Sequence, residues 1–377
     1  MRLKLIYLVT EDWYFWSHRL PIARAARDDG YDVVVATHVQ DYGDKIRDEG
    51  FRLIPLRFSR ETHPPQEEAR ALFEVRQLYR REQPDIAHQV ALKPVMYGAV
   101  ALFGNTRTKV VNAFAGLGYL VASPSWKAKI MRIGVWNAFK VFLNRPNFHL
   151  LFQNQEDQAL MMAKLKVPYE RTTIIRGSGV DLHRFHPDPE PSGTPIVLLP
   201  SRMLWIKGIE EFVAAAKIVR EKGVNARFVL VGDSDPDNFS CIPREKLLEW
   251  QSSGVVEWWG HQQDMQKALT QANLVCLPSR GGEGVPKALL EAAACGRAIV
   301  ATDVPGCRDI VRDGVSGLLV PARNPLALAE AIQKMLNSPE ARAQMALRCR
   351  EIAVKEFSQE VVAQQTLELY RRLLNSP

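Results

Sequence analysis

The stretch NLVCLPSRGGEGVPKALLEAAA, residues 273–294, decides the fold class. Its first part, 273–278, is a short apolar run typical of a buried strand. A glycine-rich loop follows, and Pro286 stands where proline is favoured, at the first position of a helix that we expect to end at Ala294. A buried strand that passes through a short loop into a helix is the repeating unit of parallel α/β proteins.

The loop of this unit carries groups suited to an anionic ligand. The amides of Gly284 and Val285 would point out of the helix N-terminus, where a phosphate group is stabilised. Glu283 precedes the helix and Glu291 lies in its second turn, so both carboxylates could face one ligand. The alternative is an ordinary strand–loop–helix unit with two solvated glutamates.

The same alternation extends through most of the chain. Short β-rich runs are each followed by a helix-length segment, which predicts parallel sheets covered by helices on both faces. We expect strands at 4–9, 32–37, 51–56, 85–90, 109–114 and 149–154, and again at 195–200, 226–232, 255–260, 273–278 and 297–302.

A proline-rich segment, HPDPEPSG at 186–193, interrupts the alternation and suits neither a helix nor a central strand. It predicts a boundary between two doubly wound, Rossmann-like domains that face each other across a cleft. Ligands of such sheets bind at the carboxyl ends of the strands. We expect a first domain over 1–187, a linker over 188–194, a second domain over 195–355 and a C-terminal helix, 356–377, that returns to the first domain.

Composition and missing motifs exclude several classes of protein. Of the 377 residues, 46% are hydrophobic and 24% charged, which rules out a disordered or collagen-like chain. The five cysteines form no C-x-x-C pair, so neither a zinc site nor a disulfide framework is indicated. No G-x-G-x-x-G follows the first strand, which counts against a nicotinamide enzyme, and the common hydrolase signatures are missing.

The charge of the chain is unevenly distributed. The net charge is +7, and residues 86–155 contain eight Lys and Arg but no Asp or Glu. Such a window indicates that an anionic partner approaches this part of the molecule. Nucleic acid would explain the window, but it would leave the phosphate site of the second domain unused, so we expect no nucleic-acid partner.

A second group of candidate residues follows the first strand of the second domain. The segment SRMLWIKG, 201–208, places Arg202 and Lys207 between a strand end and a helix start, where two cations can clamp a diphosphate. Two cations in a loop are by themselves more often surface charge, but the glycine–glutamate loop belongs to the same sheet. The D-S-D at 233–235 has the letters of a metal-binding motif without supporting carboxylates, and we interpret it as a turn.

Together these segments resemble the retaining glycosyltransferases of family 4, which have the GT-B fold. The E-x7-E spacing of that family is met by Glu283 and Glu291. Its R-x4-K-G element is met by Arg202, Lys207 and Gly208. The resemblance covers nearly the whole chain and is most specific in the second domain.

Other segments narrow the resemblance. GSGVDLHRFHP at 177–187 looks like the segment that closes the first domain in this family. Three further segments are similar to bacterial enzymes that elongate a lipid-linked sugar during surface-polysaccharide assembly: WWGHQQDM (258–265), ATDVPGCRD (301–309) and GLGYL (116–120).

The resemblance implies a role for each matching residue. Arg202 and Lys207 would hold the donor diphosphate and stabilise the charge of the leaving group. Glu283 would contact the donor sugar, and Glu291 the ribose hydroxyls. No metal or other cofactor would be needed, because cations and a helix terminus neutralise the leaving group. The remaining residues of the donor site would be Gly260, Gly284, Val285 and Pro286.

The first domain departs from the family's pattern. The aromatic segment EDWYFWSHR, 11–19, stands where many relatives have a glycine-rich loop after the first strand. Its rings could line the acceptor side of the cleft or pack beneath a neighbouring loop. The histidines could equally be structural, and the glycines could form a tight turn. Candidate acceptor contacts are Trp16, His18, His88, Gly116 and Gly118.

A helix expected over 124–144 suggests a membrane contact. Apolar positions such as Ile133 and Val141 would cover the sheet. A basic stripe that contains an indole suits an anionic bilayer surface, whereas the alternative is a crossover helix whose charges face water. The stripe consists of residues spaced by three or four positions, which share one helix face: Lys129, Arg132, Trp136 and Lys140.

We therefore expect a cytoplasmic, metal-independent, retaining glycosyltransferase, peripheral on the cytoplasmic face of the inner membrane. It would move a sugar from a nucleotide sugar, in first place a UDP-N-acetylhexosamine, to a glycan linked to polyprenyl diphosphate. The alternatives are transfer to a soluble acceptor and a catalytically silent nucleotide-sugar-binding protein. The chain contains all four charged site residues, Arg202, Lys207, Glu283 and Glu291, which argues against a catalytically silent protein.

Overall fold

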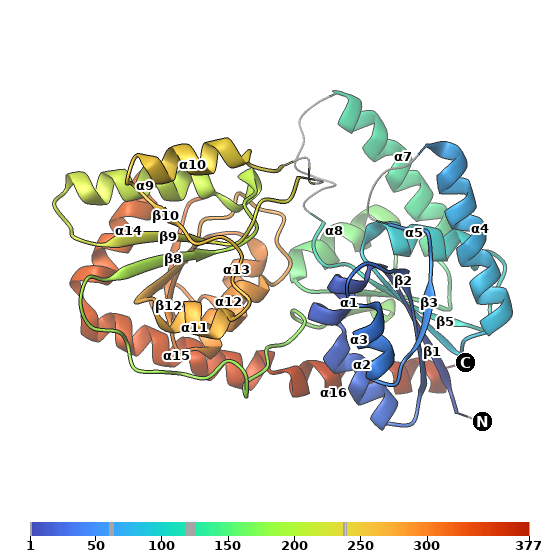
Figure 1. Ribbon diagram of the computed structural model, residues 1–377. Coiled ribbons are helices and arrows are strands. Elements are labelled where there is room, and N and C mark those ends of the chain that lie inside the picture. The colour runs from blue at the N-terminus through green and yellow to red at the C-terminus, as the bar shows by residue number, and fades with distance from the viewer. Residues whose placement is uncertain (1, 60–63, 118–125, 237, 239, 377) are drawn as a thin grey trace. The chain divides into compact units, whose positions relative to one another are not determined.

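The chain forms two compact units, each an α/β sandwich (Figure 1). One unit comprises residues 1–178 and 359–377, and the other comprises residues 179–358. The computed structural model describes residues 2–59, 64–117, 126–236, 238 and 240–376, with no side-chain detail for 126–132.

The first unit contains a seven-stranded parallel sheet in the order β3-β2-β1-β4-β5-β6-β7. Its strands are β1 (Lys4–Glu11), β2 (Asp32–His38), β3 (Arg52–Pro55), β4 (Ile86–Val90), β5 (Lys109–Ala113), β6 (Phe148–Phe152) and β7 (Thr172–Ile174). Its helices are α1 (Asp12–His18), α2 (Leu20–Asp28), α3 (Gly43–Asp48), α4 (Pro65–Glu82), α5 (Leu92–Ala101), α7 (Trp126–Leu143), α8 (Gln155–Leu165), the 3-10 turn η1 (Tyr169–Arg171) and α16 (Gln359–Asn375).

The second unit contains a six-stranded parallel sheet in the order β10-β9-β8-β11-β12-β13. Its strands are β8 (Ile196–Pro200), β9 (Arg227–Val231), β10 (Glu257–Trp258), β11 (Leu274–Leu277), β12 (Ala298–Thr302) and β13 (Leu318–Val320). Its helices are the 3-10 turn η2 (Trp205–Lys207), α9 (Ile209–Glu221), α10 (Arg244–Ser252), α11 (Met265–Thr270), α12 (Lys287–Ala294), α13 (Pro305–Ile310), α14 (Pro325–Asn337) and α15 (Pro339–Phe357).

In each sheet, the first strand of the unit lies in the interior, and the strand order runs in opposite directions on its two sides. β1 lies between β2 and β4, and β8 lies between β9 and β11. Ligands of open α/β sheets bind outside the carboxyl ends of the strands at such a switch point. The loops that follow β8, β9 and β11 therefore meet at one edge of the second sheet, and these loops carry Arg202, Lys207 and Glu283.

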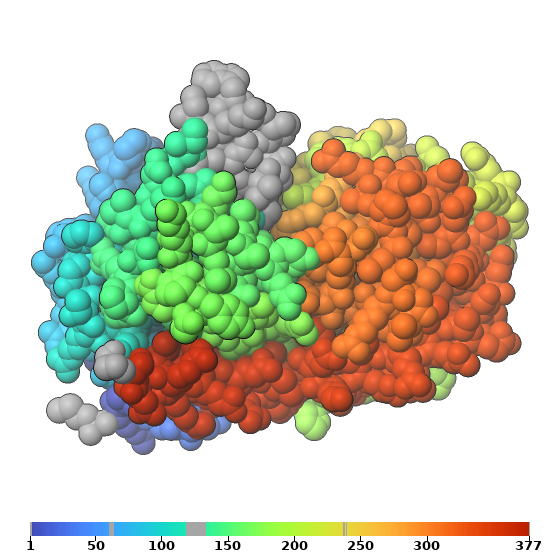
Figure 2. Space-filling model, turned by 180° about the vertical axis from the view of Figure 1, so that it is seen from behind, coloured from blue at the N-terminus to red at the C-terminus, as the bar shows by residue number. Residues whose placement is uncertain are grey.

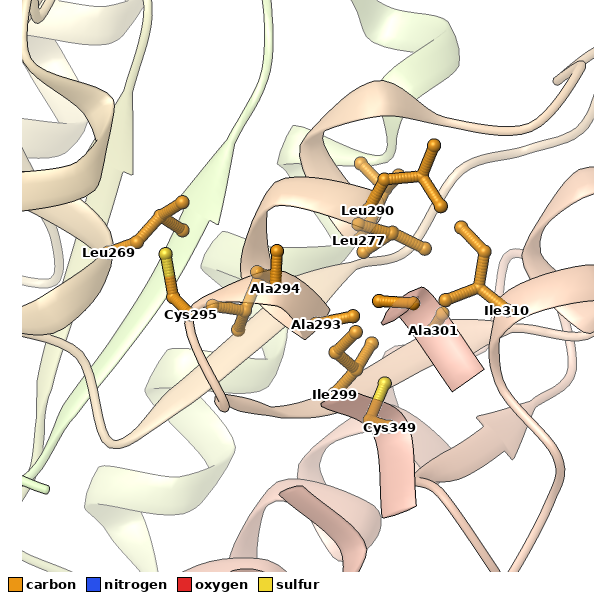
Figure 3. Packing of buried hydrophobic residues seen from close by; sticks show 14 of the residues in the cluster. Leu269, Leu277, Leu290, Ala293, Ala294, Cys295, Ile299, Ala301, Ile310 and Cys349 are labelled. Carbon is orange, nitrogen blue, oxygen red and sulfur yellow. The ribbon is translucent and has the colours of Figure 1, made fainter. Parts of the chain in front are cut away.

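The core of the second unit holds α12 close to the sheet. Leu290 and Ala293 of α12 lie over Ile299 and Ala301 of β12, and Cys349 of α15 closes the cluster (Figure 3). All five side chains are fully buried. The small residues let the helix approach the strands closely, so the loop that enters α12 is held by a rigid base.

The proline-rich segment is part of the second unit, so the predicted linker over 188–194 is wrong. The boundary between the units lies at 178/179. The side chain of Asn273 donates to Glu190 Oε1 at 2.7 Å, and Arg342 forms an ion pair with Glu190. Proline lacks a backbone donor, but these side chains attach the segment to the domain that follows it.

The C-terminal helix α16 belongs to the first unit and packs on α2 (Figure 2). Tyr370 of α16 is fully buried, and its hydroxyl lies 3.0 Å from the hydroxyl of Tyr7. The same hydroxyl is hydrogen-bonded to Nδ1 of His88. Burial, with the positive charge of Arg19 nearby, lowers the pKa of His88 well below its usual value. The helix is therefore attached through a neutral, buried hydrogen-bonded cluster.

Candidate active site

Lys207 and Glu283 form the centre of the candidate site in the second unit. Lys207 Nζ lies 2.7 Å from Glu283 Oε1 and 2.9 Å from Oε2. Ser279, fully buried after β11, donates its hydroxyl to Glu283 Oε1 at 2.7 Å. Only 19% of the Lys207 side chain and 11% of the Glu283 side chain are exposed. The two charges that the sequence placed in separate motifs thus form one largely buried ion pair.

The loop that carries Lys207 packs directly against the loop that carries Glu283. Gly208 has φ +74°, and a Cβ there would lie 1.9 Å from the carbonyl oxygen of Pro278. The amide of Arg280 donates to the carbonyl of Ile206 at 2.8 Å. Only glycine combines this backbone conformation with so close an approach, which explains the glycine that follows the lysine.

Arg280 attaches the same loop to the start of α9. Its guanidinium donates to both carboxylate oxygens of Glu211, at 2.7 and 3.0 Å, and to Glu210 Oε2 at 2.7 Å. These three residues were not among those predicted from the sequence. The signal was available, because two adjacent glutamates stand one residue after the lysine–glycine pair and an arginine follows β11.

Arg202 is paired with Asp235, which the sequence analysis did not predict. Arg202 Nη1 lies 2.6 Å from Asp235 Oδ2, while 47% of the arginine side chain remains exposed. The D-S-D segment does lie in the loop after β9, where Met203 N donates to the carbonyl of Asp233 at 3.0 Å. Because β8 and β9 are neighbours, their following loops meet, and Asp235 positions the arginine. Across the described parts of the chain, no three His, Cys, Asp or Glu side chains are grouped as a metal ion would require.

Glu291 lies on α12 with Lys287 Nζ 3.8 Å from its Oε1. Burial raises the pKa of the Glu291 carboxyl, and the positive charges of Lys287 and Arg184 partly counteract this effect. Gly260, after β10, has φ +65° and accepts a hydrogen bond from Gly232 N at 2.8 Å. Neither residue contacts the Lys207–Glu283 pair through a hydrogen bond.

The glycine loop before α12 adopts conformations that disfavour other residues. Gly281 has φ +122° and Gly282 has φ +77°. Gly284 and Val285 are buried. Pro286 is the N-cap with ψ 119°, so the helix begins at Lys287, one residue later than predicted. The predicted contact of the Gly284 and Val285 amides with a phosphate stays a prediction.

His88 is fully buried beneath α16, so its predicted contact with an acceptor is wrong. The residue is at the middle of β4, with Nε2 lacking a hydrogen-bond partner. A helix from the far end of the chain covers the residue.

The aromatic segment forms helix α1 rather than a loop. Phe15 is fully buried in the core, whereas Trp16 is half-buried and packs against Tyr42 at 5.8 Å between ring centroids. His18 stacks on Tyr14 at 4.2 Å. The predicted acceptor contacts of Trp16 and His18 stay predictions.

Two further acceptor-side candidates are the glycines after β5. Gly116 is half-buried with φ +114°, and Gly118 lies outside the described residues. Arg19, which the sequence analysis did not single out, is 3% exposed and lines a cavity of about 10 Å³ at the same sheet edge. Its Nε has no hydrogen-bond partner among the described residues, and the cavity has the size of one water molecule.

Helix α7 faces the core differently from the prediction. Trp136 is half-buried and packs against Phe139 at 6.0 Å, so it does not stand on an outward stripe. Ile133 and Val141, predicted to cover the sheet, are 62% and 61% exposed. Lys140 is exposed as predicted. The side chains of Lys129 and Arg132 lie outside the described residues.

Two family models match the chain. One, described as glycosyl transferase 4-like, matches residues 4–145, and the other, glycosyl transferases group 1, matches residues 194–338. The chain belongs to these glycosyltransferases. The glycosyltransferase is 29% identical to the N,N'-diacetylbacillosaminyl-diphospho-undecaprenol α-1,3-N-acetylgalactosaminyltransferase of Campylobacter jejuni, over 96% of each chain.

Solved structures share its fold. The sucrose-phosphate synthase of Thermosynechococcus elongatus superposes with a TM-score of 0.81 and 23% identity over 99% of both chains. Anabaena HepE in complex with UDP and glucose superposes with a TM-score of 0.77 and 18% identity, over 98% of this chain and 100% of that chain. These structures confirm the predicted GT-B fold, and the two family models confirm the predicted family.

A substitution at Gly306, at the start of α13, tests whether the position of the glycine loop before α12 matters for activity. A Cβ at this position would lie 1.3 Å from the carbonyl oxygen of Gly284, so Gly306→Ala must displace the loop before α12. A displacement of about 1 Å at a reacting site can cost about 10²-fold in rate. We expect nucleotide-sugar turnover to fall by this order, while far-UV circular dichroism stays unchanged.

Gly134→Ala is the matched control, because a Cβ at Gly134 of α7 meets no atom within 4 Å. Equal turnover in the two variants would contradict the assignment of the glycine loop to the active site.

Proposed function

We propose that this glycosyltransferase moves a sugar from a nucleoside diphosphate to a glycan on polyprenyl diphosphate, with retention of the anomeric configuration. The observation that carries the proposal is the Lys207–Glu283–Ser279 cluster, beside Arg202 at the carboxyl edge of the second sheet. The acceptor class is supported by the Campylobacter relative, whose name includes a diphospho-undecaprenol carrier. Assembly of a surface polysaccharide is the process that such a transfer would serve.

The donor diphosphate needs positive charge, and Lys207 and Arg202 supply it. In the structure each cation is paired with a carboxylate, Lys207 with Glu283 and Arg202 with Asp235. A diphosphate would draw these cations from the carboxylates through charge-assisted hydrogen bonds. As the bond to the sugar breaks, negative charge grows on the diphosphate, and cations already in position stabilise it without reorganisation. We therefore propose that the transfer requires no metal ion and no other cofactor.

Glu283 would orient the donor sugar rather than accept a proton. Its carboxylate already accepts hydrogen bonds from Lys207 and Ser279, and its other lone pairs can accept from sugar hydroxyls. The acceptor proton would then pass to a phosphate oxygen of the donor. Attack from the face that the diphosphate leaves would retain the configuration of the sugar.

Glu291 would bind the ribose. Burial makes its charged form costly, as the raised pKa indicates. Hydrogen bonds from two ribose hydroxyls would stabilise that charged form, so binding of a nucleotide and ionisation of Glu291 would favour each other. A UDP-N-acetylhexosamine is our proposal for the donor, supported by the N-acetylgalactosaminyl group in the relative's name.

The configuration of the product tests the proposal directly. We would incubate the protein with a panel of UDP-sugars and an undecaprenyl diphosphate-linked saccharide, and read the anomeric configuration of the product from proton coupling constants. We expect one donor to react, with the configuration of the donor retained and with equal rates with and without EDTA. An inverted product would refute the mechanism. Transfer only to free saccharides would refute the lipid-linked acceptor, and donor binding without turnover would indicate a silent binding protein.

We propose further that the protein is cytoplasmic and associates peripherally with an anionic membrane through α7. No helix in the described ranges is long and apolar enough to cross a bilayer. Ile133 and Val141 are exposed on α7 beside Lys140, and the whole segment 86–155 lacks acidic residues. Exposed apolar side chains next to cations suit insertion into the headgroup region of anionic lipids.

Sedimentation with anionic liposomes checks this contact. We expect Ile133→Ser/Val141→Ser to reduce sedimentation at low salt and to leave nucleotide-sugar affinity unchanged, and the Gln variants of Lys129, Arg132 and Lys140 to do the same. Val315→Ser/Leu347→Ser is the control, because these residues are 54% and 60% exposed in the second unit. If the parent protein does not sediment with anionic liposomes at low salt, the membrane contact is wrong.

A further inference from the structure

A pocket of about 430 Å³ lies at the edge of the first sheet that the catalytic proposal does not use. It is lined by the end of α4, by the segment that follows α5, and by the segments that enter β4 and β5. These are the amino ends of the strands, whereas ligands of open α/β sheets bind at the carboxyl ends. The pocket is therefore separate from any substrate site at the switch point of this sheet.

Three arginines line this pocket, and no carboxylate does. Arg76 and Arg80 lie one turn apart on the same face of α4, and Arg107 precedes β5. Their guanidinium groups are exposed, and they form no hydrogen bond or ion pair with any residue that the structure describes. Many other arginines of the chain are paired with an acid, as Arg81 is with Glu82.

The carboxylates nearest in sequence already have partners. Glu74, on α4, is paired with Arg57. Glu82, at the end of α4, is bound by Lys4, Arg52 and Arg81. Asp85 accepts a hydrogen bond from Lys4 N at 2.7 Å. All three carboxylates are therefore held by residues that do not line the pocket.

Helix stabilisation does not account for the three charges. The C-terminal ends of α4 and α5 each carry about half a negative charge, and a cation in a last helical turn is favourable for that reason. Arg80 is in the last turn of α4, but Arg76 is earlier and Arg107 is not in a helix. Two helix ends offset about one of the three positive charges, so the pocket keeps a clear positive excess.

The pocket is also preorganised. Asn105 Oδ1 accepts hydrogen bonds from the amides of Arg107 and Thr108, at 2.9 and 3.0 Å, which holds the backbone of Arg107 in place. Phe103, 63% exposed, lines the same pocket, and the guanidinium of Arg145 stacks 4.2 Å from its ring centroid. An exposed, fixed ring beside three guanidinium groups offers an apolar surface next to an anion-binding one.

We propose that this pocket binds a ligand that carries two or more phosphate groups. Guanidinium groups match phosphate oxygens with paired hydrogen bonds, and three such pairs engage more terminal oxygens than one phosphate group presents. The ligand has two possible sources, a soluble diphosphate or a diphosphate-bearing lipid headgroup, with Phe103 against the adjoining part of the ligand. This site is distinct from the Lys207 site, which belongs to the other unit.

Calorimetric titration with inorganic pyrophosphate tests the soluble source. The parent protein should bind pyrophosphate at two sites, one of which is lost in Arg76→Gln/Arg80→Gln/Arg107→Gln and the other in Lys207→Ala. We expect the affinity of the lost site to fall at least about tenfold. Replacing the same three arginines with lysine keeps the charge but removes the paired hydrogen bonds. This variant should retain part of the affinity. The control, Lys164→Gln/Lys217→Gln/Lys334→Gln, makes the same change in charge at exposed helical positions and should bind as the parent does.

Flotation with phosphatidylcholine vesicles containing cardiolipin, which has two phosphate groups, tests the lipid source. Vesicle binding that falls in the Arg→Gln variant and not in the control supports the pocket with a lipid ligand, and loss of one pyrophosphate site supports it with a soluble ligand. If the Arg→Gln variant equals the control in both measurements, the proposal is wrong. That result would leave the donor site unaffected, because Lys207→Ala reports on it separately.

Discussion

The ion pair between Lys207 and Glu283 is the interaction on which the candidate site depends. Opposite charges 2.7 Å apart and largely removed from water attract strongly, and either charge buried alone would be costly. The pair forms only because Gly208 lets its loop pack against the carbonyl of Pro278 and because Ser279 orients the carboxylate. If a bound diphosphate pairs with Lys207, Glu283 loses one hydrogen-bond partner. It would still accept hydrogen bonds from Ser279 and from the hydroxyls of the donor sugar.

The parallel sheet brings these loops together, and this part of the structure was predictable. Continuous apolar runs predicted most of the strands to within a few residues, and their alternation with helices predicted parallel, doubly wound sheets. The strands that were missed, β7 and β13, are three residues long and too short to produce a pattern. The loop positions of Arg202, Lys207 and Glu283 predicted that they lie at one edge of the second sheet, because the first two lie between β8 and α9 and the third between β11 and α12. Glu291 lies within α12, and the roles of all four residues stay predictions.

Long-range packing was not predictable from local patterns. Nothing around His88 indicates that a helix from the far end of the chain covers it, and the Tyr370 hydroxyl that binds it is 282 residues away. Trp136 packs against the core and Ile133 is exposed, which is the reverse of the prediction. Helix spacing determines which residues share a face, but not which face meets the sheet. The proline-rich segment predicted a linker because its backbone suits neither a helix nor a central strand, yet the side chains of Asn273 and Arg342 hold it to the second unit.

The central claim is that Lys207 is transferred from Glu283 to a bound diphosphate, and a double-mutant cycle on UDP affinity tests it most directly. Calorimetry would compare the parent, Lys207→Met, Glu283→Gln and the double variant. UDP lacks the sugar, so Glu283 acts on its binding only through its charge, as a competitor for Lys207 and as a carboxylate close to the diphosphate. The account predicts that Lys207→Met weakens UDP binding at least about tenfold, that Glu283→Gln leaves it equal or tighter, and that the two effects are not additive. Equal UDP affinity in the parent and in Lys207→Met would contradict the account.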